Sequence, residues 1–225
     1  MLTIPVAEEI SFVGSQDCCV CFIDIVDSTR ITTVEIGQSE KIKSYYSIFI
    51  NTMAAIARDF DGTIIKNTGD SLIFYFPKTI GPTSNINMID LKNVFECGLT
   101  MIAVNPTINA KLKEKGLPGL SYRISADYGQ VEVAKSLTST SEDLFGPTVN
   151  LCSKINSRAS PNQMVIGHNL YKITKAAFGN NKYHFHQVDN YSIDNNLENQ
   201  YPVYSVSNIS EKTYDKRIKV YKNIV

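Results

Sequence analysis

Apolar and polar residues follow several different periods along the first third of the chain. Residues 18–26 (CCVCFIDIV) form a nearly continuous apolar run with β-branched members, which is typical of a central strand buried on both faces. From Ser39 to Phe60 the apolar side chains recur at spacings of three and four, which predicts an amphipathic helix that ends at Asp61-Gly62. Residues 63–76 then predict an apolar hairpin with its turn at Asn67-Thr68-Gly69.

The rest of the chain predicts further helices and strands, separated by polar segments. Helices are expected over residues 90–115, 146–159 and 168–178. Strands are expected over residues 121–127, 130–134, 163–167, 183–189 and 201–206, with a turn at Tyr128-Gly129. Loops are expected over residues 77–89, 136–143 and 190–200.

The order of the first elements indicates a fold class. Strand, helix, hairpin, helix and strand in succession give a ferredoxin-like βαββαβ core, an α/β protein of the α+β sandwich type. Extra strands and a helix follow at the C-terminal end. We expect a single domain over residues 1–225, with its core at about residues 18–206.

Composition narrows the function classes. The 225 residues are 43% hydrophobic and 20% charged, as in ordinary globular proteins. The 22 basic and 22 acidic side chains cancel, which argues against a broad nucleic-acid-binding surface. The chain does not open with a signal-peptide pattern, and its apolar runs are too short to span a bilayer, so we expect no membrane insertion. The five cysteines, without zinc-ligand spacing, favour a reduced, cytoplasmic protein.

Two acidic residues stand at unusual places in this pattern. Asp24 interrupts the end of the buried strand, and Asp70 follows the hairpin turn. Taken alone, Asp24 could accept hydrogen bonds from turn amides, and Asp70 could form a surface ion pair with Lys66. In the ferredoxin-like order, however, the first strand lies beside the hairpin, so the two carboxylates could meet at one end of the sheet. Neighbouring carboxylates repel unless a cation joins them, and Mg²⁺ takes one or two carboxylates together with substrate phosphates.

Four segments in this order resemble the class III nucleotidyl cyclase catalytic domain: FIDIVDST (22–29), IKNTGDSL (65–72), YRISADYG (122–129) and DLFGPTVNLCSK (143–154). The resemblance runs from about Cys18 to Ile166, with a family-like strand at YPVYSV. One such motif occurs by chance, whereas four in the correct order and secondary structure are specific. The resemblance implies a cyclase in which the ribose 3′-hydroxyl attacks the α-phosphate and pyrophosphate leaves.

The resemblance also implies roles for the acids and for the turn after the first strand. Asp24 and Asp70, with Ile25, would hold two ions of Mg²⁺ or Mn²⁺ per site. Arg123 matches the arginine that grips the triphosphate, although a strand arginine also commonly extends to solvent. Phosphate oxygens would meet the backbone amides of the turn Ile25, Val26, Asp27, Ser28 and Thr29.

Asp27 is a departure from the family pattern. Many members carry a small glycine at this position, which helps the backbone approach phosphate. Asp27 could cap the next helix, or it could add a negative charge or a further metal contact beside the triphosphate.

Lys66 and Asp143 match the family's purine-selecting pair. Adenine presents an acceptor at N1 and an amine donor at N6, which suit a lysine donor and an aspartate acceptor. Guanine presents the opposite pattern at the corresponding edge, so the pair favours ATP over GTP.

Asn150 and Lys154 lie four residues apart and therefore share one helix face, a spacing that solvated helix surfaces also use. The resemblance implies that Asn150 orients the ribose. Lys154 stands where typical members carry a transition-state arginine, and lysine lacks the planar fork that reaches two oxygens at once. We therefore expect a slow but active enzyme.

Together the residues and the resemblance predict an adenylate cyclase that makes 3′,5′-cyclic AMP from ATP. The family implies a head-to-tail homodimer with two composite sites. The alternatives are a nucleotide-binding or dimerisation module that has lost catalysis, and a guanylate cyclase. A diguanylate cyclase shares the ferredoxin-like core, but its G-G-[DE]-E-F hairpin does not match N-T-G-D-S.

Overall fold

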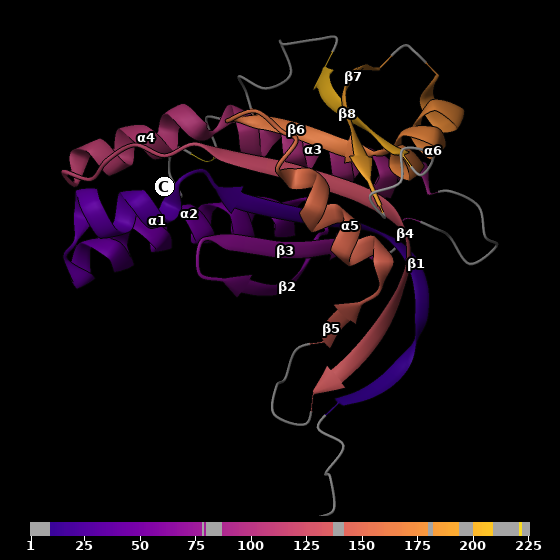
Figure 1. Ribbon diagram of the computed structural model, residues 1–225, viewed down its shortest axis with the longest axis horizontal. Coiled ribbons are helices and arrows are strands. Elements are labelled where there is room, and N and C mark those ends of the chain that lie inside the picture. The colour runs from indigo at the N-terminus through magenta and orange to yellow at the C-terminus, as the bar shows by residue number, and fades with distance from the viewer. Residues whose placement is uncertain are drawn as a thin grey trace, which may run out of the picture.

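A computed structural model describes residues 10–77, 79, 87–136, 142–179, 182–193, 200–208 and 221. Within these residues one sheet of eight strands runs in the order β2-β3-β1-β4-β6-β8-β7, and β5 pairs with the outer part of β4 (Figure 1). The strands are β1 Ile10–Ile25, β2 Thr63–Thr68, β3 Ser71–Phe76, β4 Tyr122–Ser136, β5 Glu142–Phe145, β6 Gln163–Gly167, β7 Tyr183–Ser192 and β8 Gln200–Asn208. The helices are α1 Ser28–Arg30, the π-helix η1 Ile31–Ile36, α2 Ser39–Asp59, α3 Met88–Ala103, α4 Asn105–Glu114, α5 Pro147–Asn156 and α6 His168–Phe178.

The predicted ferredoxin-like core is confirmed by the strand order. Strands β2, β3, β1 and β4 are neighbours in that sequence, and β1 is antiparallel to both β3 and β4. The C-terminal additions continue the sheet beyond β4, because β6 pairs with β4 in parallel and β8 and β7 follow. The end of β1 therefore lies between the hairpin β2–β3 and the start of β4.

Side chains of β1 alternate between two hydrophobic clusters. Cys19, Cys21 and Ile23 pack into the larger cluster with α2 and α3, whereas Cys18 and Val20 face the smaller cluster that includes Cys152 of α5. In Figure 1, α5 lies in front of the sheet and α2 and α3 lie behind it. The period of two places Asp24 on the α5 side of the sheet, away from α2.

The amphipathic pattern of α2 is confirmed, since its apolar stripe is fully buried. Tyr45, Phe49, Met53 and Ile56 have no exposed surface. Burial of each such side chain stabilises the fold by about 1.5–3 kcal/mol before the entropy of ordering is counted. This helix covers the face of the sheet opposite to Asp24.

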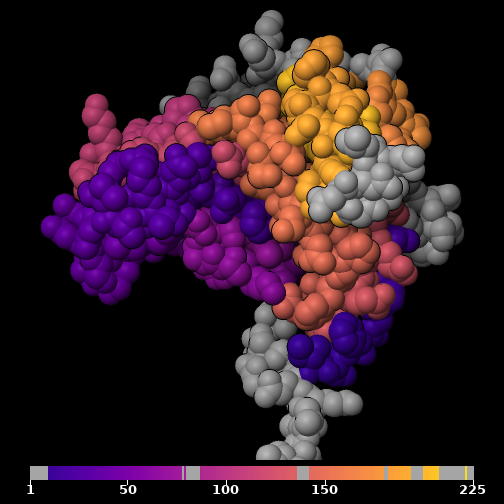
Figure 2. All heavy atoms as spheres, viewed as in Figure 1, coloured from indigo at the N-terminus to yellow at the C-terminus, as the bar shows by residue number. Residues whose placement is uncertain are grey.

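The predicted turn at Tyr128-Gly129 is wrong, because β4 runs through it without a break. Gly129 pairs with Cys18 of β1. A Cβ at Gly129 would lie 2.6 Å from Oγ1 of Thr148, so this glycine allows α5 to approach the strand closely. Strand β1 also begins at Ile10 rather than at Cys18. Its first part is mostly exposed, and the ribbon it forms with β4 and β5 extends away from the body of the molecule (Figures 1 and 2).

The single helix predicted over residues 90–115 is also wrong. The chain forms α3 and α4, which meet at Val104, because Pro106 has no N–H and clashes with a helix that precedes it. The cap of α3 is Asn87, whose Oδ1 accepts hydrogen bonds from the backbone N–H groups of Ile89 and Asp90.

The loop predicted over 136–143 is wrong at both ends, because Ser136 belongs to β4 and the last two residues belong to β5. Residues 137–141 lie outside the described part of the chain, but Glu142 and Asp143 belong to β5. All five cysteines fall within the described ranges, are buried and form no disulfide. No helix in the described residues is both long and apolar enough to cross a bilayer.

Candidate active site

The end of β1 and the tip of the hairpin bring two acids together. Asp24 lies opposite Ser71 in the β1–β3 register, and the backbone N–H of Ile25 donates to the carbonyl oxygen of Asp70 at 3.3 Å. Both aspartates line one open depression of about 630 Å³ with the turn that follows β1. The sheet order expected from sequence therefore does place these two carboxylates at one site.

The pKa of Asp24 is shifted by its surroundings. Burial and the nearby charge of Asp70 raise its pKa to about 6, while Arg123 acts in the opposite direction. Arg123 lies directly opposite Asp24 in the β1–β4 register. Its Nε is buried and has no hydrogen-bond partner among the described residues. A guanidinium charge thus stands beside the acids, with one buried N–H that no described residue accepts from.

The donor set at this depression fits a hard cation. The described residues contain no group of three or more His, Cys, Asp and Glu side chains that would hold a metal by themselves. Two carboxylates with an open front suit Mg²⁺ or Mn²⁺, which complete their shells with water and substrate phosphates. The Ser28 hydroxyl donates to the Asp70 carboxylate and fixes its orientation.

The turn after β1 differs in detail from the expectation. The amide of Ile25 is engaged with Asp70, and the amide of Val26 donates to the Ser121 carbonyl oxygen at 2.9 Å. These two amides are therefore not available to phosphate. Of the five amides expected to bind phosphate, those of Asp27, Ser28 and Thr29 remain as candidates.

Asp27 does not cap the following helix. Its side chain makes no capping hydrogen bond, and its φ of 55° lies in the left-handed region. Glycine adopts this conformation without the steric cost that an aspartate meets. The aspartate therefore occupies a backbone position suited to glycine, and its carboxylate lines the same depression as Asp24 and Asp70.

A second group of predicted residues lies on the neighbouring strands β2 and β5. Lys66 of β2 donates from Nζ to both carboxylate oxygens of Asp143, at 3.0 Å to Oδ1 and 2.7 Å to Oδ2. The backbone N–H of Leu144 donates to Asp143 Oδ1 at 2.9 Å and helps to orient the carboxylate. The two side chains are 45% and 32% exposed, so a ligand can reach them. Asp143 reaches this position because β5 pairs with β4, with Asp143 opposite Ala134.

Asn150 and Lys154 lie one turn apart on the exposed side of α5. Neither side chain has a hydrogen-bond or ion-pair partner in the part of the chain that the structure describes. Neither lines the depression at Asp24, and Lys66 and Asp143 do not line it either. Within one chain, the predicted site residues thus form separate groups.

One cation that the sequence reasoning missed lies at the depression. Arg30 lines it together with the acids, and its guanidinium pairs with Glu35. The available signal in the sequence was its place three residues after Asp27, in the first helical turn that follows β1. A basic residue there is close to any phosphate that the turn binds.

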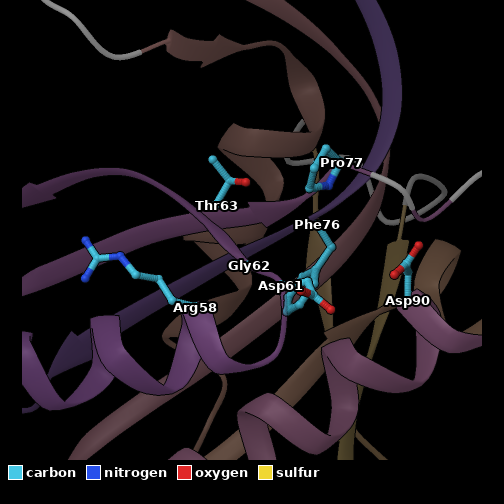
Figure 3. A pocket seen from close by; sticks show the side chains of 7 residues that line it. All are labelled: Arg58, Asp61, Gly62, Thr63, Phe76, Pro77 and Asp90. Carbon is cyan, nitrogen blue, oxygen red and sulfur yellow. The ribbon is translucent and has the colours of Figure 1, made fainter.

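A further hollow, of about 250 Å³, lies elsewhere and is shown in Figure 3. Its lining includes Thr63 and Phe76, at the end of the hairpin opposite to Asp70. Arg58 extends away from the carboxylate of Asp90 in this view (Figure 3). This hollow is therefore separate from the acids of the candidate site.

Comparisons with known proteins identify the family and the fold. The sequence matches the family described as "Adenylate and Guanylate cyclase catalytic domain" over residues 11–208. A cytidylate cyclase of Staphylococcus aureus is 27% identical over 172 residues, which is 70% of this chain but 37% of that protein's length.

Solved cyclases share the fold. The adenylyl cyclase CyaB from P. aeruginosa superposes with a TM-score of 0.74 at 20% identity, over 88% of this chain and 97% of the other. The guanylyl cyclase Cya2 gives a TM-score of 0.71 at 21% identity, over 89% and 96%. The family match spans most of the chain and includes every residue of the candidate site, so the chain belongs to the family of adenylate and guanylate cyclase catalytic domains.

Proposed function

We propose that this chain is an adenylate cyclase that converts ATP to 3′,5′-cyclic AMP and pyrophosphate. The observation that carries the proposal is the Lys66–Asp143 pair, a donor and an acceptor 2.7 Å apart on an accessible surface. Adenine N1 and the N6 amine are neighbours on the base edge, an acceptor beside a donor, and they match this pair. Guanine presents N1–H beside O6 and would set donor against donor and acceptor against acceptor.

A second substrate satisfies the same pair. Cytosine presents an acceptor at N3 beside an amine at N4, whereas uracil presents N3–H beside O4. The pair therefore divides the four nucleotides into ATP and CTP on one side and GTP and UTP on the other. The similarity to a cytidylate cyclase favours CTP as the second candidate substrate.

The triphosphate is assigned to the depression at the end of β1. Asp24 and Asp70, with Ile25, are the residues proposed to hold two ions of Mg²⁺ or Mn²⁺. Bound there, the ions would lower the pKa of the ribose 3′-hydroxyl and offset charge on the α-phosphate. Arg123, which lies opposite Asp24 in the β1–β4 register, is proposed to bind phosphate oxygens with its fork of N–H donors.

Apart from the metal ions, the protein contributes by positioning the substrate and stabilising charge. The ribose 3′-oxygen forms a bond to the α-phosphorus, the bond to the bridging oxygen of the leaving pyrophosphate breaks, and the hydroxyl proton passes to water. Asn150 is proposed to orient the ribose, and Lys154 to stabilise the charge that develops on the phosphate. The Lys154 ammonium does so less effectively than a guanidinium, which is the reason we propose a slow reaction.

A complete site is proposed to need two copies of the chain. The acids line the depression at the end of β1, whereas Lys66 and Asp143 of the same chain do not line it. In a head-to-tail homodimer the acids of one subunit would face the base-selecting pair of its partner. The interface of the homodimer would then hold two such sites.

The test is turnover of the purified chain with Mn²⁺ and each of the four nucleoside triphosphates, with products identified by mass spectrometry. We expect ATP to be cyclised fastest, CTP next, and GTP and UTP least. A preference for GTP or UTP would overturn the assignment of Lys66 and Asp143. Faster turnover of CTP than of ATP would make the second candidate the substrate. No product with any triphosphate would favour the module that has lost catalysis.

A further inference from the structure

The depression at the end of β1 is rich in negative charge. Asp24, Asp27 and Asp70 all line it, and Arg30 is the only basic side chain among its lining residues in the described part of the chain. A triphosphate is itself a polyanion, so three carboxylates oppose its binding unless cations compensate them. Arg30 is therefore the lining residue whose positive charge can offset the repulsion between these carboxylates and a triphosphate.

Arg30 stands between two hollows. It also lines the neighbouring hollow of about 480 Å³ with Asn109 and Ser121. The side chain thus lies on a shared rim that ligand can approach from either side. Its side chain is 59% exposed, so it can move without unpacking the core.

The present partner of Arg30 is weakly held. Nη1 of Arg30 lies 2.5 Å from Oε1 of Glu35, which is 37% exposed and belongs to the π-helix η1. Exposed ion pairs contribute little to stability, because water and salt screen them. An arginine fork binds two phosphate oxygens at once, an arrangement that is stronger than a single contact to one carboxylate oxygen. Exchange of Glu35 for phosphate would replace one contact to a carboxylate oxygen with two contacts to phosphate oxygens. Rare π-helical turns also frequently accompany functional sites.

We propose that Arg30 is a triphosphate-binding residue that leaves Glu35 for phosphate oxygens when nucleotide binds. The proposal rests on the proposed function in so far as the ligand is a nucleoside triphosphate. All four nucleotides carry the same triphosphate, so the contribution of Arg30 is independent of the base. Glu35 acts as a competitor that lowers affinity in the absence of nucleotide.

The experiment measures binding of magnesium tripolyphosphate, which lacks a base and ribose, to the full chain by isothermal titration calorimetry. Arg30→Gln removes the guanidinium and is expected to weaken binding about tenfold, the usual effect of losing a hydrogen bond to a charged group. Glu35→Gln frees Arg30 and is expected to tighten binding. Arg30→Lys keeps the charge without the fork and should fall between Arg30→Gln and the unaltered chain.

The matched control is Lys43→Gln. Lys43 also carries an exposed ion pair, 2.6 Å to Glu40, but it does not line the depression. Equal affinity of the Arg30→Gln and Lys43→Gln variants for tripolyphosphate, with both folded by circular dichroism, would overturn the proposal.

Kinetics add a second readout. Arg30→Gln should raise KM for ATP and for CTP by the same factor, with little change in kcat, and a loss confined to kcat would contradict a binding role. If no triphosphate is cyclised but Arg30→Gln still weakens tripolyphosphate binding, the cyclase reaction fails while the Arg30 site stands.

Discussion

Lys66 and Asp143 stand 77 positions apart in the sequence, yet Nζ of Lys66 lies within 3.0 Å of both carboxylate oxygens of Asp143. The ammonium on β2 and the carboxylate on β5 neutralise each other and present one donor and one acceptor together. A base that satisfies both can bind without leaving a polar group unmatched. The first prediction follows from this pairing.

Lys66→Met is expected to lower kcat/KM for ATP and CTP on the order of tenfold to a hundredfold, because Asp143 and the base acceptor lose their donor. GTP and UTP should change little, since the pair never matched them. The control is Lys135→Met, which removes a lysine of β4 that pairs at 3.7 Å with Glu142, the neighbour of Asp143. Equal losses with all four triphosphates would show that Lys66 does not read the base.

Lys154→Arg is expected to raise kcat several-fold, because the planar guanidinium can contact two oxygens of the developing transition state. Lys154→Ala should lower kcat by about tenfold to a hundredfold while KM changes less. Steady-state kinetics with ATP and Mn²⁺ check both. Arg158→Lys serves as the control, since Arg158 follows α5 and pairs with Asp189 instead of lining the site. Unchanged turnover in Lys154→Ala would rule out the proposed role.

Asp27→Gly is expected to lower KM for ATP, because it removes a carboxylate from the depression where the triphosphate is proposed to bind. The free energy of unfolding should rise by up to about 1 kcal/mol, since glycine relieves the left-handed backbone.

Asp61→Gly is the matched control, because Asp61 has a similar φ of 64° but lies at the separate hollow in Figure 3. Only Asp27→Gly should change KM, and Asp61→Gly should gain less stability because it also removes the acceptor of a hydrogen bond from Nδ2 of Asn93. A similar KM change in the two variants would assign the effect to backbone strain instead of charge.

The pKa of Asp24, about 6, predicts the pH dependence of metal binding. Only the ionised carboxylate binds a divalent cation well, so the affinity for Mn²⁺ should fall as the pH drops through about 6. Calorimetric titration of Mn²⁺ between pH 5 and pH 7.5 measures this. Equal affinity at the two limits would contradict a metal role for Asp24, and Asp24→Asn should bind weakly at both.

The stability of the metal-free fold changes with pH in the opposite direction to the metal affinity. The folded state binds the Asp24 proton more tightly than the unfolded state, whose aspartates titrate near a pKa of about 3.9. Asp24 therefore stabilises the fold as the pH falls from about 6 toward 4, and that stabilisation is lost as the pH rises through 6. Buried Asp127, with a pKa also raised to about 6 by burial, acts in the same direction. Thermal unfolding of Asp24→Asn should show a smaller change over this range than the unaltered chain.

The composite homodimer predicts complementation. Lys66→Ala and Asp70→Ala should each be impaired as homodimers, by roughly tenfold or more in kcat/KM, but a mixture should regain activity. Each heterodimer would contain one site with both defects and one site with neither. Inactivity of the mixture, although heterodimers are detected by native mass spectrometry, would contradict the head-to-tail arrangement.

Several features of the fold followed from local pattern. The apolar run at 18–26 and the stripe of α2 mark burial that any compact arrangement must satisfy, and they predicted the centre of the sheet and its covering helix. The misassigned positions have identifiable causes. Gly129 was read as a turn, although its missing side chain makes room for Thr148. The strand β5 carries too little apolar pattern in four residues to distinguish it from a loop.

By itself, the sequence determined the ferredoxin-like core and the proximity of Asp24 to Asp70, because the order of strands and helices fixes which strand ends are neighbours. Four motifs in the correct order indicated the family, and the family match over residues 11–208 confirms it. Only the tertiary structure decided how the turn residues are used. In the fold, the amides of Ile25 and Val26 donate to backbone carbonyl oxygens, and Arg30 lines the same depression as the acids. Hydrogen-bond partners and side-chain directions depend on atoms that are distant in the sequence, and local composition carries no record of them.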